Sequence, residues 1–181
     1  EAAYLEESKR KPTENMAAYD YILRAKDHHH KRTQEDNTKA IEMAQKAIEL
    51  DPGYSQAHAW HACSLGQALG AGYIEEEKVL GQIVEAAKGL EANQQDDAEC
   101  HRILTELNLH FYADFDKARF HQDRAHALNP NDPRIVSQRG EMLVWLGEAA
   151  EAVGWIEKAM LLDPSETEAR VKHLGKAHYV A

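Results

Sequence analysis

A spacing of about 34 residues recurs along the chain and restricts its fold more than any other feature. The interval from Ala125 to Ala159 is 34, and so is the interval from Pro130 to Pro164, within the segments DRAHALNPNDP and EKAMLLDPSET. A repeat of this length is one supersecondary unit, which buries its apolar face only by stacking on its neighbours. The spacing therefore predicts an all-α chain of stacked helix pairs.

Two earlier copies extend the repeat towards the N-terminus. QKAIELDPGYS places Ala47 and Pro52 at the equivalent positions, and EAAKGLEAN places Ala87 there, with Ala92 in the place of the proline. The alanine intervals, 47 to 87 and 87 to 125, are 40 and 38, so they carry insertions of six and four. The sequence predicts four helix pairs and one terminal helix, at about 15–52, 55–92, 97–130, 133–164 and 166–180.

Local start and stop signals agree with these boundaries. Thr33 to Asp36 resembles a capping box, and so does the segment that Ser165 opens. Asp132 and Pro133 are typical of an N-cap followed by proline at the first helical position. Gly147 stands where the glycine after a helix belongs.

Small and apolar residues at fixed positions of the last full repeat carry a family resemblance. They are Val136, Arg139, Gly140, Leu143, Ala152, Ile156, Ala159 and Pro164. This pattern resembles the tetratricopeptide repeat (TPR), and the resemblance covers nearly the whole chain. It implies a right-handed TPR superhelix, an α-solenoid of four helix pairs plus a terminal helix. In such a pair, Gly140 and Ala152 would let the two helix backbones approach closely.

The segment KPTENMAAYDYILRAK resembles a particular setting of such repeats. It is similar to the segment that joins an upstream domain to the C-terminal TPR region of bacterial class III adenylate/guanylate cyclase-like multidomain regulators. The matching residues are Lys11, Pro12, Glu14, Asn15, Ala18, Tyr19, Asp20, Tyr21, Leu23, Arg24 and Ala25. The resemblance implies a linker at 1–14 from an upstream domain, a TPR domain at 15–181, and an accessory role in a cytoplasmic bacterial regulator. The chain contains no cyclase catalytic segment, so no catalytic residue is carried over.

Charge and composition exclude several classes of partner. The chain has 31 acidic and 21 basic residues and a formal net charge of −10. Residues 51–100 hold nine acidic and two basic side chains, which accounts for −7 of that total. A nucleic-acid surface needs clustered Lys and Arg, so we expect no nucleic-acid partner. No apolar run approaches the roughly 18–20 residues that span a bilayer, so we expect no membrane insertion. Two cysteines, Cys63 and Cys100, are compatible with a reducing, cytoplasmic compartment.

Eleven histidines raise the question of a metal site. His28, His29 and His30 are contiguous, so on a helix they point about 100° apart and cannot converge on one ion. A second set contains His58, His61, Cys63, Cys100 and His101. His58 and His61 also occupy repeat-core positions, and structural zinc sites need tighter ligand pairs such as C-x2-C. The sequence predicts packed or surface histidines, with no metal and no cofactor.

The chain also lacks the local motifs of catalysis. No G-x-S-x-G, P-loop or G-x-G-x-x-G is present, and no serine is placed beside a base. We therefore expect a protein that is not an enzyme.

The concave groove lined by the first helices of successive pairs is the predicted functional surface. We expect it to bind a protein or peptide, in the form of an extended segment or a helix. The predicted lining is Lys26, His29, Trp60, Cys63, Gln67, Arg102, Glu106, Arg134, Glu141 and Trp145. Replacing both Arg102 and Arg134 by Glu is expected to weaken partner binding without unfolding the helices.

One specialised mode of binding is not expected. TPR domains that clamp a terminal carboxylate use Lys, Asn and Arg at set positions, which here hold Ile22, Lys26 and Trp60.

Three alternatives stay open. Trp60 and Trp145 belong equally well to the core between repeats. The chain could form a homodimer through the terminal helix or the acidic second repeat. It could also sense a small ligand in the third repeat, whose interior is unusually polar because of Thr105, Asn108 and Gln122.

Overall fold

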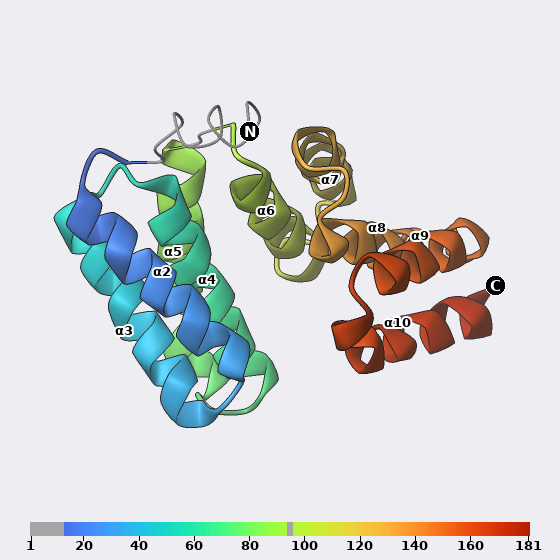
Figure 1. Cartoon of the computed structure of the whole chain (residues 1–181), viewed down its shortest axis with the longest axis horizontal. Helices are drawn as coiled ribbons and strands as arrows, with labels where there is room; N and C mark the ends of the chain where they lie inside the picture. Colours follow the sequence, from blue (N-terminus) through green and yellow to red (C-terminus); the bar gives the residue numbers. More distant parts are fainter. Residues whose placement is uncertain (1–12, 94–95) are drawn as a thin grey trace. The chain divides into compact units, whose positions relative to one another are not determined.

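The computed structural model describes residues 13–93 and 96–181, and the regular elements within these ranges are all helical (Figure 1). The elements are α2 (Met16–Lys31), α3 (Gln34–Leu50), α4 (Ser55–Gly70), α5 (Glu76–Ala92), α6 (Ala98–His110), α7 (Phe115–Leu128), α8 (Pro133–Trp145), α9 (Ala149–Leu162), a 3-10 turn (Pro164–Glu166) and α10 (Thr167–Val180). The predicted all-α class is confirmed. Most of the predicted linker, including Lys11 and Pro12, lies outside the described residues.

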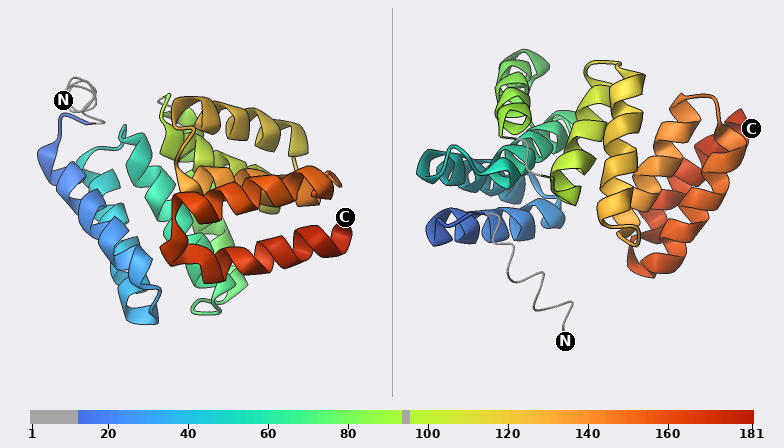
Figure 2. Two further views of the ribbon diagram at one scale, coloured as in Figure 1. Left: turned by 45° about the vertical axis from the view of Figure 1, so that its right-hand side comes forward. Right: turned by 90° about the horizontal axis from the view of Figure 1, so that it is seen from above.

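The chain divides into two compact units, residues 1–95 and 96–181. The first contains the pairs α2–α3 and α4–α5, and the second contains α6–α7, α8–α9 and the single helix α10. Figure 2 shows the two helices of each pair side by side and antiparallel. No helix in the described ranges is long and apolar enough to cross a membrane.

Three helix ends follow the sequence signals. Thr33 Oγ1 accepts the Asp36 N–H, Asp132 accepts the Arg134 N–H, and Gly147 has a φ of +79°. The Ser165 hydroxyl donates to Asp163 Oδ1 at 2.6 Å. The rest of the capping box predicted from Ser165 depends on side chains at 166–168, which lie outside the described residues.

Small residues let the helices of the first unit pack closely. Ala18, Ala25, Ala44 and Ala47 are fully buried, together with Ile22, Tyr54 and Trp60. These small side chains allow the backbones of α2 and α3 to come together while the larger ones fill the space towards α4.

A glycine makes room for His58 in the second pair. A Cβ on Gly89 would lie 2.2 Å from His58 Nδ1. The imidazole occupies that space, and its Nε2 lies 2.9 Å from the Pro52 carbonyl oxygen. His58 therefore serves the packing of α4 on α5.

The second unit shows the close helix approach that the repeat pattern predicts. A Cβ on Gly140 would lie 2.5 Å from Ile156 Cγ1 and 3.1 Å from the carbonyl oxygen of Ala152. Val136, Leu143, Ile156, Ala152 and Ala159 are all buried. The glycine therefore sets the separation between α8 and α9.

The polar residues of the third repeat bond to the backbone. Thr105, Asn108 and Gln122 are all buried. Gln122 Nε2 donates to the Ile135 carbonyl at 2.8 Å. Thr105 Oγ1 donates to the His101 carbonyl and Asn108 Nδ2 to the Leu104 carbonyl. Their donors are thus used within the protein, whereas Gln122 Oε1 is buried without a hydrogen-bond partner among the described residues. The small-ligand alternative stays a prediction.

Candidate functional site

The structure brings together the five predicted groove residues of the first unit. Lys26 Nζ lies 5.2 Å from the ring centre of Trp60, and the His29 ring lies 5.3 Å from it. Cys63 Sγ is 3.7 Å from His29 Nε2, and Gln67 Nε2 donates to the His29 carbonyl at 3.3 Å. These contacts join α2 to α4, so this set of side chains forms an interhelical network.

Trp60 itself belongs to the core of that unit. Its side chain is 2% exposed and packs with Ile22, Ala25 and Ala57. A side chain so covered contributes to stability and offers no surface to a partner. The core alternative therefore holds for Trp60.

The two predicted arginines of the second unit are held in ion pairs. Glu99 accepts from Arg102 Nη2 at 2.8 Å and lies 3.0 Å from Arg134 Nη2, while Arg134 also pairs with Asp132 at 2.7 Å. Burial raises the pKa of Asp132, but the hydrogen bond and charge of Arg134 outweigh it and leave this pKa below its usual range. Two cations and two anions cancel, so this end of α6 and α8 is not a positive patch.

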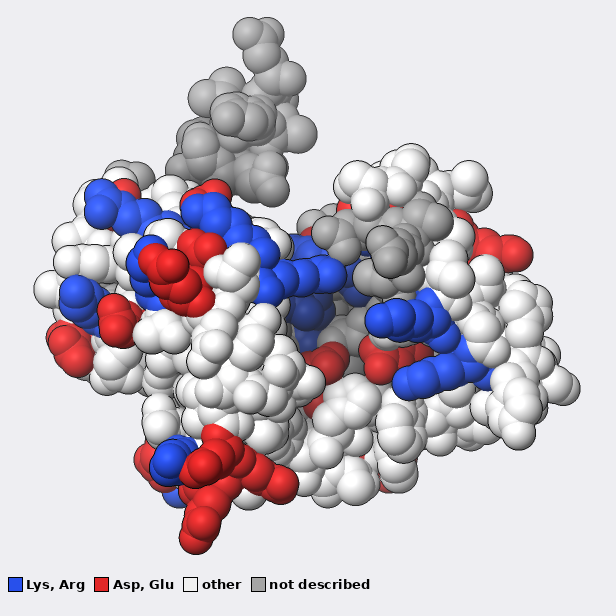
Figure 3. Space-filling model, turned by 90° about the horizontal axis from the view of Figure 1, so that it is seen from below, with Lys and Arg blue, Asp and Glu red and all other residues white. Residues whose placement is uncertain are grey.

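Acidic and basic side chains also occur together elsewhere on the surface. Figure 3 shows acidic and basic side chains interspersed on one face of the molecule, with large areas that carry no charge.

Acidic and imidazole side chains gather further along the same helices. His110 Nε2 on α6 lies 3.5 Å from Glu106 and 3.7 Å from Glu141 of α8. His173 of α10 lies 3.6 Å from the other oxygen of Glu141. Gln138 Nε2 also donates to Glu106 at 2.9 Å. Burial raises the pKa of Glu141, and the like charge of Glu106 raises it further.

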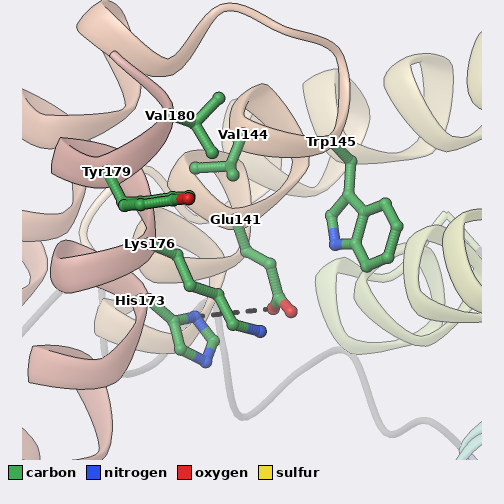
Figure 4. A pocket seen from close by; sticks show the side chains of 7 residues that line it. All are labelled: Glu141, Val144, Trp145, His173, Lys176, Tyr179 and Val180. Carbon is green, nitrogen blue, oxygen red and sulfur yellow. Dashed lines mark ion pairs between the residues drawn. The ribbon is translucent and has the colours of Figure 1, made fainter.

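A pocket of about 350 Å³ lies between α8 and α10, next to this acidic cluster (Figure 4). Its lining consists of Glu141, Val144, Trp145, His173, Lys176, Tyr179 and Val180. In Figure 4, Val144 lies beside Val180 and a dashed line joins His173 to Glu141. Trp145 is 56% exposed and Tyr179 is 92% exposed. Large aromatic surfaces thus stand open around an apolar hollow.

The repeat explains why these groups form rows. The step from Trp145 to Tyr179 is 34, and the steps from His110 to Trp145 and from Glu106 to Glu141 are both 35. The rings of His110 and Trp145 meet edge to face, with centroids 5.6 Å apart. Successive first helices α6, α8 and α10 therefore present His110, Trp145 and Tyr179 in a row, beside Glu106 of α6 and Glu141 of α8.

Only part of this site follows from the sequence prediction. Glu106, Glu141 and Trp145 are among the predicted groove residues, whereas sequence reasoning missed His110, Val144, His173, Lys176, Tyr179 and Val180. The step from Trp145 to Tyr179 is a signal that could have found this end of the site, but a terminal helix is ordinarily explained as a cap.

Three of the histidines and cysteines considered for zinc have other partners. His58 bonds to Pro52, Cys63 contacts His29, and His101 Nδ1 lies 2.9 Å from His121 Nδ1. In the described part of the chain, one different group could hold an ion: Glu106, His110 and Glu141 offer ligand atoms within 4.8 Å of one another.

Comparisons with known sequences give one weak relative. No family model matches the chain. U-box domain-containing protein 70 of Oryza sativa subsp. japonica is 28% identical over 128 residues, which are 69% of this chain and 15% of that protein. The chain thus spans about 15% of the length of the curated relative that it matches.

Solved structures are similar in fold. Pseudomonas aeruginosa PilF has a TM-score of 0.63 at 17% identity, over 91% of this chain and 69% of that one. A thermophilic TPR protein of Thermus thermophilus has a TM-score of 0.59 at 18% identity, over 91% and 88%. YrrB, described as a TPR protein with an unusual peptide-binding site, has a TM-score of 0.50 at 18% identity, over 99% and 92%. The chain therefore has the helical-repeat fold of tetratricopeptide-repeat proteins.

Proposed function

We propose that this chain is a non-catalytic protein-interaction module that binds a partner peptide or helix on the first-helix face of its second unit. The pocket between α8 and α10, with Trp145 and Tyr179 exposed around it, carries the proposal. Exposed aromatic rings beside a small apolar pocket are the usual anchors of protein interfaces. The description of YrrB as having a peptide-binding site also supports a peptide as the ligand of this fold.

The first unit has a supporting role in this proposal. Lys26, His29, Cys63 and Gln67 contact one another or Trp60 and are only half-exposed. These predicted groove residues thus hold α2 against α4. The absence of nucleophile and phosphate-loop motifs from the sequence supports a non-catalytic role.

A peptide display experiment tests the proposal. A library of random peptides is selected on the wild-type chain, and the enriched peptides are measured against Trp145→Ala and Tyr179→Ala. Leu161→Ala is the matched control, because Leu161 is 83% exposed on α9 and does not line the pocket. Loss of binding in the two pocket variants, with retention in the control, supports the proposal. No enrichment, or equal binding by all the variants, overturns it.

Self-association is a second candidate function. Leu161, Val171 and Val180 are exposed apolar side chains on α9 and α10, which favours the terminal helix as a contact surface. The other route, through the acidic second repeat, would bring like charges together, because residues 51–100 carry a net charge of −7. Sedimentation velocity over a wide concentration range tests this candidate, and a monomer at every concentration eliminates it.

The wider setting of the module rests on the resemblance of residues 11–25. This resemblance supports the assignment of the chain as a cytoplasmic accessory region of a larger bacterial signalling or regulatory protein, with residues 1–14 as a linker from an upstream domain. The curated relative is a plant protein, so it adds nothing to the bacterial assignment. Sequencing the gene upstream of the Glu1 codon tests this part directly, and the absence of an upstream signalling domain would contradict it.

A further inference from the structure

We propose that the partner segment carries a Lys or Arg next to an apolar residue, with the cation between Glu106 and Glu141 and the apolar side chain in the α8–α10 pocket. This inference rests on the proposed function and names the chemistry of the partner.

The carboxylates supply the first argument. Glu106 and Glu141 lie on neighbouring helices, and His110 is within 3.7 Å of both. A cation placed beside them would relieve the mutual repulsion of the two carboxylates. Lys176 lines the same pocket, and His110 and His173 contact the carboxylates. With neutral imidazoles, one positive charge faces two negative charges. The face therefore retains an acidic excess that a basic side chain complements.

The aromatic row supplies the second argument. Trp145 and Tyr179 line the same pocket as Glu141, and Figure 4 shows them on either side of it. The face of an indole or phenol attracts a cation, and the aliphatic stem of Lys or Arg covers an aromatic surface well. Basic side chains can thus meet a carboxylate and a ring at the same time.

The size of the pocket supplies the third argument. A volume of about 350 Å³ is at the lower end of ligand pockets, so it suits one or two side chains. Val144 and Val180 give it an apolar wall. An aliphatic or aromatic residue adjacent to the cation would fill this space.

The sign of the charge excludes the opposite class of partner. An acidic segment would meet Glu106 and Glu141, and it would gain little from Arg102 and Arg134, which already pair with Glu99 and Asp132. Like charges brought together at an interface oppose binding. The partner is therefore basic at this site.

The same display selection tests the inference, since its peptides can be sorted by charge. Enrichment of adjacent basic and apolar residues on the wild-type chain is expected. Binding of those peptides should weaken about tenfold in the double variant Glu106→Gln/Glu141→Gln. The isosteric Glu157→Gln, on the exposed side of α9, is the matched control and should change nothing. Thermal melts followed by circular dichroism confirm that each variant is folded.

A charge reversal sharpens the result. Selection on Glu141→Lys should enrich acidic residues in place of basic ones. If peptides require Trp145 but show no basic preference, or bind the double glutamine variant unchanged, the inference fails and the proposed function stands. If no peptide binds at all, both fail.

Zinc is the competing occupant of the acidic cluster. Titration of the wild-type chain with ZnCl₂ in the absence of peptide reports whether Glu106, His110 and Glu141 bind the ion. Stoichiometric zinc binding that is lost in the double glutamine variant, combined with no preference for basic peptides, would overturn the inference.

Discussion

The imidazole of His29 packs edge to face against the indole of Trp60, with ring centroids 5.3 Å apart and an interplanar angle of 80°. This contact joins the first helices of two successive pairs and leaves Trp60 only 2% exposed. Trp145 lies on the first helix of a later pair, yet it is 56% exposed. Two tryptophans that look alike in the sequence thus have opposite roles.

We therefore expect the two tryptophans to respond differently to truncation. Trp60→Ala should lower the free energy of unfolding by about 3–5 kcal/mol, because it removes a large buried side chain. Trp145→Ala should lower it by less than about 1 kcal/mol. Trp60→Phe should cost less than Trp60→Ala, since Trp60 Nε1 has no hydrogen-bond partner to lose. Urea unfolding measures all three, and equal losses for Trp60→Ala and Trp145→Ala would contradict the assignment.

Two glycines on packed helices provide a second test. Gly140→Ala should lower the free energy of unfolding by about 1–3 kcal/mol, because its Cβ would meet Ile156 and the Ala152 carbonyl. Gly154→Ala is the matched control, since nothing lies within 4 Å of its added Cβ. This control should gain about 0.5–1 kcal/mol from better helix propensity. Melting temperatures that move in the same direction would show that Gly140 does not set the helix separation.

Because Glu99 pairs with both Arg102 and Arg134, we expect these residues to contribute to stability. Glu99→Ala should lower the free energy of unfolding by about 1–3 kcal/mol, because two cations lose a largely buried partner. Asp20→Ala breaks the exposed Arg24–Asp20 pair and should change it by no more than about 0.5 kcal/mol. Chemical denaturation of both variants makes the comparison.

The double replacement of Arg102 and Arg134 by Glu affects the same ion pairs. It would place two new acids beside Glu99 and Asp132, so we now expect a loss of stability. Arg102→Gln and Arg134→Gln are the milder variants for any binding measurement. A fully stable double Glu variant would show that these pairs contribute little.

Two buried histidines should make stability depend on pH. Burial, together with the nearby His58, lowers the pKa of His61 to about 4. Burial, together with the nearby His101, lowers the pKa of His121 to about 4. An unfolded histidine has a pKa near 6.5, so the unfolded chain binds more protons between about pH 6.5 and pH 4. The free energy of unfolding should therefore fall as the pH drops through this range, by about 1–2 kcal/mol per histidine between pH 7 and pH 5.

Substitution isolates this dependence from the titration of carboxylates. His121→Gln and His61→Gln should each flatten the loss of stability between pH 7 and pH 5, as measured by urea unfolding at both values. His178→Gln, at an exposed position of α10, serves as the control and should keep the wild-type slope. Parallel slopes for all the variants would rule out the two buried imidazoles as the cause.

Features that depend on local chemistry could be predicted from the sequence. The caps at Thr33 and Asp132 act within one helical turn, and the glycine after α8 needs only its own backbone freedom. The close approach at Gly140 followed from the repeat register, which places Ala152 and Ile156 opposite it. These relations are fixed by spacing alone.

Features that depend on how one helix pair stacks on the next could not be predicted from the sequence. The pairing of Glu99 with Arg134 joins α6 to α8, and an acid in the first turn of a helix is ordinarily explained by the helix dipole. The exposed fraction of each tryptophan likewise depends on which neighbouring helix covers it. His173 and Tyr179 belong to the site because α10 continues the row of first helices. The sequence of a terminal helix does not indicate that it takes part in a binding site.

The short reach of the interactions has a consequence for biosynthesis. The Tyr73 hydroxyl donates to the Arg32 carbonyl and so joins the second helix pair to the first. The Asn93 amide donates to the Pro52 carbonyl and so joins the end of the second pair to its start. Each of these hydrogen bonds connects positions only 41 residues apart. Contacts this local need only short loops to close, and chains built from them fold rapidly. Each helix pair can therefore acquire its structure as soon as the ribosome releases the next, so that α2 and α3 are in place while the later repeats are still being translated.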